Sequence, residues 1–330
     1  MLKFLLNILA IDSTSGQEEN LADFIVANYT PQEAIVEIQQ IPNGKKNIYF
    51  KWGNPKVIFC SHLDTVSPYI PPSRDAFTVY GRGACDAKGQ IAAIYQTCQE
   101  LSAAKQTDFG MLLLAGEEAG SYGAEIANKL ITGCNYVIVC EPTLNKLITA
   151  AKGYSLIAVK IKGKAAHSGY PEFGINALKI FHLFLNKLDT LNFPVDQILG
   201  TTTYNIGLLR SNNVCNVVPD EITFNLLFRT TFATYNIIQT MVAALSEENI
   251  EMQYIYTDLP QRFHVVPGFA TDVVAYGSDA PKLFNLGKPL LYGPGNILVA
   301  HSVNEQIAIA ELEKAVIDLQ NIYYALLKEV

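Results

Sequence analysis

The sequence predicts a two-domain α/β protein, in which a ferredoxin-like domain is inserted into a domain with a largely parallel sheet. Three observations support this architecture. The chain has 330 residues, 49% of them hydrophobic, which is enough for two packed cores. Between residue 47 and about residue 150, short apolar runs alternate with helical patterns, whereas residues 153–258 show a different order of elements. From residue 288 onward the first pattern resumes.

The first domain is predicted from short runs that are hydrophobic on both faces. These runs are "NIYFKW" (47–52), "VIFC" (57–60), "MLLLA" (111–115) and "YVIVC" (136–140). Between the second and third runs, "KGQIAAIYQTCQELSAA" (88–104) repeats apolar residues at the spacing of an amphipathic helix. Strands that are buried on both faces and separated by helices are typical of a parallel sheet between helical layers.

The inserted domain is predicted from an order of strands and helices that reads β-α-β-β-α-β. Its strands are "YSLIAVKI" (154–161), "TTTYNIGLL" (201–209), "ITFNLLF" (222–228) and "EMQYIYT" (251–257), and its helices cover residues 173–188 and 235–247. This order is the ferredoxin-like pattern. We therefore expect residues 1–152 and 262–330 to form the first domain and residues 153–261 to form the insertion.

Composition excludes two classes of partner. The net charge is −7, and no cluster of lysine and arginine occurs along the chain, so no surface is expected to attract nucleic acid. No apolar run reaches the ~18 residues that a transmembrane helix needs. We therefore expect neither a nucleic-acid partner nor a membrane partner.

The N-terminal segment "MLKFLLNILAIDSTSG" resembles a short signal peptide, but its details argue against one. Asn7 interrupts the apolar run, and no cleavage-site pattern of small residues follows. Ser15 and Glu18 instead have the spacing of a capping box, which predicts the start of a helix. The six cysteines include no C-x-x-C pair, and most lie in apolar runs, as expected for a reducing compartment. We therefore expect a cytoplasmic protein.

Acidic and imidazole side chains follow each core strand of the first domain. His62 and Asp64 come after "VIFC", Glu117 and Glu118 come after "MLLLA", and Glu141 follows "YVIVC". Ligands of open α/β sheets bind outside the carboxyl ends of the strands, so these groups are expected to converge. Two further candidates are Asp86, in the glycine-rich segment "GRGACDAKG", and His301, in "LVAHSVNE".

This set of side chains predicts a metal centre. Several carboxylates packed together repel one another unless a cation lies among them. Mixed imidazole and carboxylate ligands favour zinc over calcium or magnesium, and two zinc ions about 3.5–4 Å apart would form a hydrolytic site. Asp86 is the predicted bridge between them. A bend at Gly116 would let one of Glu117 and Glu118 bind metal while the other stays free, and Asp64 would orient His62.

Each of these residues also has an ordinary alternative role. His62 could be a hydrogen-bonded residue at a strand end, His301 a loop residue, and Asp86 the N-terminal cap of the following helix. Glu117 and Glu118 could be a solvated pair, and Glu141 a turn residue. The metal-centre interpretation is preferred because the same chemistry recurs after every core strand.

The chain resembles the dinuclear zinc amidohydrolase and exopeptidase family that includes acetylornithine deacetylase, succinyl-diaminopimelate desuccinylase and carboxypeptidase G2. The motifs are "SHLDTV", "YGRGACDAKG", "GEEAGSYGA", "EPT", "AAHSGYP", "NVVPDE", "GSDA" and "LLYGPG" followed by "AHSVNE". The resemblance implies a zinc-exopeptidase-like catalytic domain. It also implies that Glu117 is the general base and Asp64 the residue that orients His62. One zinc site would then use His62 and Glu141, the other Glu118 and His301, with Asp86 shared.

The same resemblance implies that residues 153–261 form a dimerisation domain. His167, in "AAHSGYP", would reach the partner subunit's active site and stabilise the oxyanion. Asn216 and Arg229 match substrate-contacting positions, and Arg229 would bind a substrate carboxylate. The family often has an acidic residue two positions before this arginine, where this chain has Leu227.

The expected activity is hydrolysis of the amide bond of an N-acyl amino acid by metal-bound hydroxide, as in acetylornithine deacetylase. The alternative within the family is a dipeptidase or aminopeptidase that uses the same two zinc ions on a short peptide. A metal-free amino-acid-binding module is a third hypothesis, disfavoured because every proposed ligand is present. Cobalt or manganese can replace zinc in such a site. A homodimer formed through the inserted domain is expected.

Overall fold

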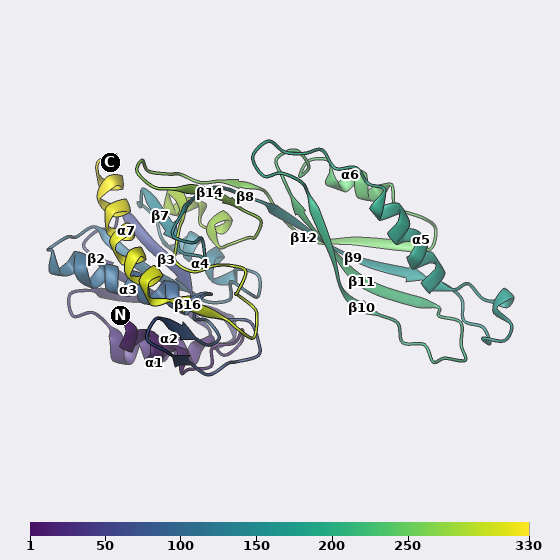
Figure 1. Ribbon diagram of the computed structural model, residues 1–330, viewed down its shortest axis with the longest axis horizontal. Coiled ribbons are helices and arrows are strands. Elements are labelled where there is room, and N and C mark those ends of the chain that lie inside the picture. Colours follow the sequence, from purple (N-terminus) through teal and green to yellow (C-terminus); the bar gives the residue numbers. More distant parts are fainter. Residues whose placement is uncertain (330) are drawn as a thin grey trace. The chain divides into compact units, whose positions relative to one another are not determined.

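The computed structural model describes residues 1–329, which form two compact units (Figure 1). The first unit comprises Met1–Thr149, Phe263–Asp272 and the chain from Ser278 onward. The second comprises Ala150–Arg262 and the short segment Val273–Gly277. The two-domain α/β fold with an insertion is confirmed.

A six-stranded mixed sheet forms the centre of the first unit. Its order is β1-β2-β6-β3-β7-β15, with bounds Ile35–Gln40, Lys46–Trp52, Phe109–Leu114, Val57–His62, Tyr136–Val139 and Lys288–Leu291. The pairs β6–β3, β3–β7 and β7–β15 are parallel, as predicted. The pairs β1–β2 and β2–β6 are antiparallel. A short turn at residues 41–45 folds β2 back on β1. The sheet is therefore only partly parallel.

Helices cover both faces of this sheet. Val57 and Phe59 of β3 belong to the core cluster that also contains residues of α1 (Leu2–Leu9), α3 (Lys88–Ala103) and α7 (Ile309–Leu327). The alternate residues Ile58 and Cys60 are equally buried and lie outside that cluster. Side chains alternate across a strand, so these two face the opposite side, where α4 (Tyr122–Leu130) contacts β2 and β6. Helix α2 (Glu18–Tyr29) contacts β2.

Short strands and 3₁₀ turns occur in both units. One three-stranded sheet has the order β16-β5-β4, with bounds Gln306–Ala308, Thr78–Tyr80 and Ser73–Arg74. Another has the order β13-β8-β14, with bounds Gln261–Arg262, Leu147–Ala151 and Thr271–Val274. The 3₁₀ turns are η1 (Pro42–Gly44), η2 (Pro171–Phe173), η3 (Ala280–Lys282) and η4 (Phe284–Leu286).

The second unit has the predicted ferredoxin-like order of elements. They are β9 (Gly153–Lys162), α5 (Ala177–Asp189), β10 (Thr203–Arg210), β11 (Glu221–Thr230), α6 (Ile238–Ala243) and β12 (Ile250–Asp258). The strands form one antiparallel sheet in the order β10-β11-β9-β12. The side chain of Asn176 accepts hydrogen bonds from the Leu178 and Lys179 amides and so caps α5.

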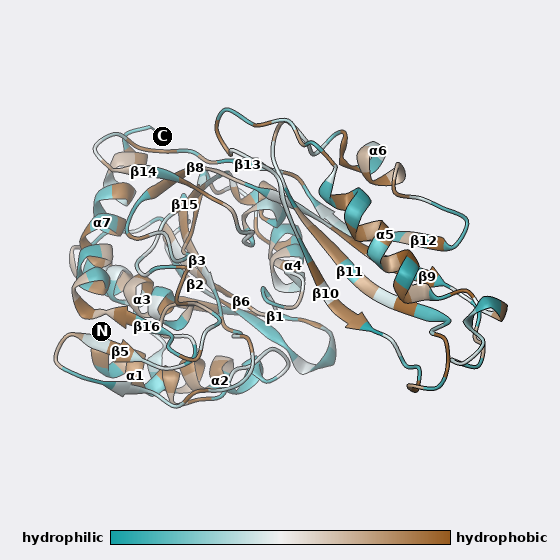
Figure 2. Cartoon of the chain, turned by 45° about the vertical axis from the view of Figure 1, so that its right-hand side comes forward, coloured by the Kyte–Doolittle hydropathy of each residue, from teal (hydrophilic) through white to brown (hydrophobic). Residues whose placement is uncertain are grey.

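One face of this second sheet is packed and the other is open. Along β11, buried residues such as Leu226 alternate with half-buried ones such as Leu227. The buried set packs against Phe184 and Leu188 of α5 and Val242 of α6. Figure 2 shows hydrophobic and hydrophilic residues alternating along α5, as this packing requires. None of the helices in the described part of the chain is both long and apolar enough to cross a bilayer.

Leu226→Ala is expected to lower the free energy of unfolding of the second unit by about 2–5 kcal/mol, because it leaves a cavity in a fully buried position. Leu227→Ala is the matched control, on the same strand and on the open face. It should cost clearly less. Urea denaturation followed by circular dichroism measures both losses, and equal losses would contradict the assignment of the two faces.

Candidate metal centre

The parallel strands bring three of the predicted sequence segments to one edge of the sheet. His62 is the last residue of β3 and lies opposite Leu114, the last residue of β6. Cys60 of β3 lies opposite Val139, the last residue of β7. The loop with Glu117 and Glu118 and the residue Glu141 therefore start beside His62, as expected from the sheet topology.

Two groups of side chains in the described part of the chain have the composition and spacing of metal sites. The first contains His62, Asp86 and Glu141, which are all buried. The second contains Asp86, Glu118 and His301. Within each group, the candidate ligand atoms lie within 4.8 Å of one another. All five predicted ligands are thus brought together.

Asp86 belongs to both groups, and each of its oxygens faces a different histidine. Asp86 Oδ1 lies 3.0 Å from His62 Nε2, and Asp86 Oδ2 lies 3.3 Å from His301 Nε2. His301 Nε2 also lies 2.8 Å from Glu118 Oε1. The alternative role of Asp86 as a helix cap is wrong, because α3 begins at Lys88 and has no side-chain cap. This carboxylate has the position expected of a bridging ligand.

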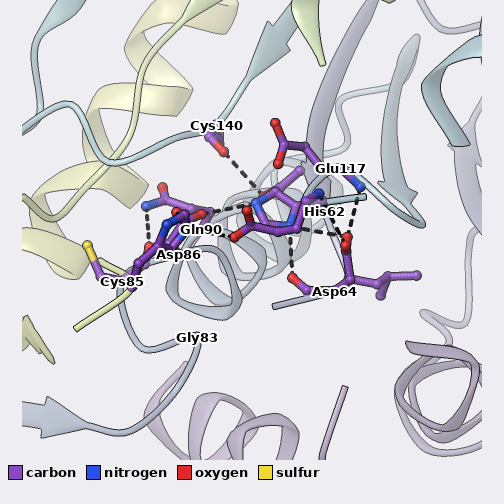
Figure 3. A network of polar contacts seen from close by, with 12 residues as sticks. His62, Asp64, Gly83, Cys85, Asp86, Gln90, Glu117 and Cys140 are labelled. Atoms are coloured by element: carbon purple, nitrogen blue, oxygen red, sulfur yellow. Dashed lines mark hydrogen bonds and ion pairs between the residues drawn. The ribbon is translucent and has the colours of Figure 1, made fainter. Parts of the chain in front are cut away.

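Asp64 contacts the glutamate loop as well as the His62 ring (Figure 3). His62 Nδ1 donates to the backbone oxygen of Asp64 at 2.9 Å, and the Asp64 carboxylate lies 3.5 Å from the same nitrogen. That carboxylate also accepts hydrogen bonds from the Glu117 amide at 3.0 Å and the Glu118 amide at 3.2 Å. Asp64 therefore holds both the histidine and the glutamate loop.

Ser15 contacts the site, although the sequence pattern assigned it to a helix cap. The predicted capping box is wrong, because α2 begins at Glu18 and has no side-chain cap. The Ser15 hydroxyl instead donates to Asp64 Oδ2 at 2.8 Å, while the Ser15 amide donates to the backbone oxygen of Thr65. A contact across about 50 residues therefore replaces the local one.

The expected bend before the two glutamates occurs at Gly116. This residue has a φ of +74°, and a Cβ atom there would lie 1.8 Å from the ring of Tyr122. A side chain at this position would have a strained backbone conformation and would displace the Tyr122 ring. The bend lets the consecutive residues Glu117 and Glu118 serve the same site.

The pKa shifts of the site residues indicate that cations would stabilise the site. Burial raises the pKa of Glu117 and that of Glu141 well above the usual range, and neighbouring carboxylates add to this effect. Contacts with Asp86 and Glu118 raise the pKa of His301 to about 10. Burial alone would raise the pKa of Asp86, but contacts with the two histidines outweigh it and lower this pKa. The imidazoles supply positive charge that divalent ions can replace, so the donor set fits a metal centre.

A sixth carboxylate in this environment was not predicted. Asp279 is buried, and its Oδ1 atom has no hydrogen-bond partner. Burial raises the pKa of Asp279 to about 7, and the charges of Asp64 and Glu118 contribute. It lies in the motif "GSDA", which follows β14 and the short apolar run "VVAY" (273–276). The same signal, an acidic residue after an apolar run, was therefore present but was not used for this segment.

The other predicted site residues lie in the second unit. His167 is exposed, and its Nδ1 accepts a hydrogen bond from the Gly169 amide at 3.0 Å. The backbone of Asn216 accepts from the Ser168 amide, so the structure places the predicted positions 167 and 216 on neighbouring loops. Arg229 lies on the half-buried side of β11 with its guanidinium 5.7 Å from the centre of the Tyr154 ring. The roles of these three residues stay predictions.

Comparison with known proteins identifies the family. Residues 149–252 match the family model described as a peptidase dimerisation domain. A peptidase M20 domain-containing protein of Schizosaccharomyces pombe is 33% identical over 93% of this chain and 80% of its own length. A probable carboxypeptidase of Aspergillus clavatus is 32% identical over 96% of this chain and 86% of its own length.

The fold has a close counterpart among solved structures. The crystal structure of a tripeptidase from Staphylococcus aureus superimposes with a TM-score of 0.81, at 22% identity, over 98% of this chain and 97% of that one. This likeness supports the fold. The identity to the two curated relatives, which extends over nearly the whole chain, shows that the protein belongs to the M20 peptidase family of hydrolases.

Proposed function

We propose that this protein is a divalent-metal-dependent exopeptidase that removes the C-terminal residue of a short peptide. The observation that carries the proposal is the five-residue cluster around Asp86, in a chain 32% identical to a probable carboxypeptidase over nearly its full length. The acetylornithine-deacetylase reading has less support, because the family identified is that of the M20 peptidases. The peptidase alternative is therefore preferred. The alternative raised by the sequence is a dipeptidase or an aminopeptidase, and we propose a carboxypeptidase instead.

The five predicted ligands would hold two metal ions, with zinc favoured by the mixture of imidazole and carboxylate donors. His62 and Glu141 would bind one ion, Glu118 and His301 the other, and Asp86 both. When bound, such ions polarise a carbonyl group and lower the pKa of water.

Glu117 is the residue proposed to move the proton. Its carboxylate is next to the ligand Glu118 but belongs to neither metal group. It would take a proton from the attacking water and return it to the nitrogen of the leaving amino acid. The Asp64 carboxylate holds the Glu117 amide at 3.0 Å and so fixes the loop that carries this base.

The proposal includes a homodimer formed through the inserted domain, and a cytoplasmic location. The match of residues 149–252 to a peptidase dimerisation domain supports the dimer. His167 would then act in the partner subunit's active site, and Arg229 would bind the carboxylate of the substrate. Analytical ultracentrifugation of the purified protein tests the dimer directly.

A panel of substrates tests the activity. Unblocked and N-blocked dipeptides and tripeptides should lose their C-terminal residue in the presence of zinc, and a chelator should abolish the release. N-acetyl and N-succinyl amino acids serve as the comparison. Release of free amino acid from the acylated compounds alone would overturn the carboxypeptidase proposal in favour of the deacylase, and mass spectrometry of the products distinguishes the two.

Glu117→Gln should lower kcat by at least about 100-fold, because the amide cannot accept the proton. The metal content should stay unchanged, since Glu117 is not a ligand. The control is Glu125→Gln, an exposed glutamate in the first turn of α4. Peptidase assays and elemental analysis measure both properties, and an active Glu117→Gln enzyme would exclude this residue as the base.

Metal binding by three single variants tests the shared ligand. Asp86→Asn should weaken binding of both ions, whereas Glu141→Gln and Glu118→Gln should each weaken only one. Equilibrium dialysis followed by atomic emission spectroscopy gives the number of ions per chain. The bridging role is wrong if Asp86→Asn loses no more metal than Glu141→Gln does.

A further inference from the structure

Glu305 is a buried carboxylate that lies outside the five predicted ligands and makes an unusual set of contacts. The residue is 2% exposed, and its side chain is fully buried. Oε1 accepts hydrogen bonds from three backbone amides in one turn, those of Gly83 at 3.0 Å, Cys85 at 3.1 Å and Asp86 at 3.0 Å. Oε2 accepts from Arg82 Nη1 at 2.5 Å. One side chain therefore satisfies four donors of residues 82–86.

These contacts complete the hydrogen bonding of a turn that lies outside regular secondary structure. Residues 81–86 precede α3 and lie in neither a helix nor a strand. The amides of Gly81, Arg82 and Ala84 donate to backbone oxygens, and the remaining three donate to the Glu305 side chain. Several amides that converge on one point form a site for an anion, and the carboxylate of Glu305 occupies it. Arg82 is also buried, which makes the ion pair part of the turn rather than of the surface.

Glu305 also connects this turn with the loop that carries His301. The two residues are four positions apart in the sequence. The backbone oxygen of Glu305 accepts from the Gly81 amide at 3.1 Å, and Arg82 Nη1 donates to the backbone oxygen of Ser302 at 3.2 Å. Directly after Glu305, Gln306 of β16 pairs with Tyr80 of β5. The segments 80–86 and 301–306 are thus joined side by side.

We propose that Glu305 is a positioning residue for the metal centre, which fixes Asp86 against His301 by binding the backbone of the Asp86 turn. The inference rests on the metal centre of the proposed function. One of the three amides belongs to Asp86 itself, whose carboxylate lies 3.0 Å from His62 and 3.3 Å from His301. A shift of the turn by a fraction of an ångström therefore changes both ligand groups.

Metal affinity, measured separately from activity, tests this role. Metal-free wild-type protein, Glu305→Gln and Glu305→Asp are titrated with Co²⁺ alone, followed by visible absorption and by calorimetry. Glutamine removes the charge and places an amide N–H₂ group among the donors, while aspartate keeps the charge but is one methylene shorter. Both variants should bind Co²⁺ about 10–100-fold more weakly, the range typical of lost contacts that orient ligands.

The matched control is Asp196→Asn in the second unit. The Asp196 carboxylate also accepts from three backbone amides, those of Ile198, Leu199 and Ala233. The variant therefore shows how the loss of a carboxylate that binds three amides changes stability, in a place away from the metal centre. Thermal denaturation of all variants in the metal-free state gives that comparison, and Asp196→Asn should keep wild-type Co²⁺ affinity.

The outcomes separate this inference from the proposed function. Weakened Co²⁺ binding in the Glu305 variants, with unchanged binding in Asp196→Asn, supports the positioning role. If wild-type protein binds Co²⁺ and both folded Glu305 variants bind it equally well, Glu305 is only structural and the proposed metal centre stands. Wild-type protein that binds no Co²⁺ would overturn the metal centre and this inference together. Glu305→Asp, the milder change, supplies the comparison if Glu305→Gln does not fold.

Discussion

The carboxylate of Asp86, held between two imidazoles, is the interaction on which the rest of the site depends. Burying several carboxylates in one place is unfavourable unless positive charge accompanies them. The structure meets this requirement with His62 on one side of Asp86 and His301 on the other. Because the two histidines come from segments more than 200 residues apart, the fold must hold both segments firmly.

Much of this arrangement was predictable because strand ends carry a local signal. An apolar run followed by His62, Glu118 or Glu141 can be read without knowing the partner strands, and parallel topology then brings such ends together. The order of elements in the second unit was predictable for a similar reason, because alternating burial along β11 has the period of a strand. The antiparallel edge of the first sheet was missed because β1 is largely exposed, and because the buried run of β2 does not reveal the direction of that strand.

The contacts that the sequence did not reveal are those whose partners no residue pattern marks. Glu305 binds backbone amides, which every residue except proline carries, so no pattern marks its partners. The same holds for the Asp64 carboxylate, which was expected beside the His62 ring and also binds two amides of the glutamate loop. Ser15 has the local spacing of a helix cap but bonds to Asp64, because long-range pairing next to Thr65 determines its position. A prediction from local spacing fails where the side chain binds a distant acceptor instead.

The two groups of side chains in the candidate metal centre are held in place by different contacts. His62 and Glu141 are buried, and the register of the central sheet places them, because His62 ends β3 and Glu141 follows β7 closely. His301 is half-exposed and lies in a loop with the exposed side chains of Leu298 and Val303, so sheet register does not constrain it. The hydrogen bonds of the 301–306 segment to the Asp86 turn replace that constraint. The half of the site formed by Glu118 and His301 therefore depends more on polar contacts than on sheet register.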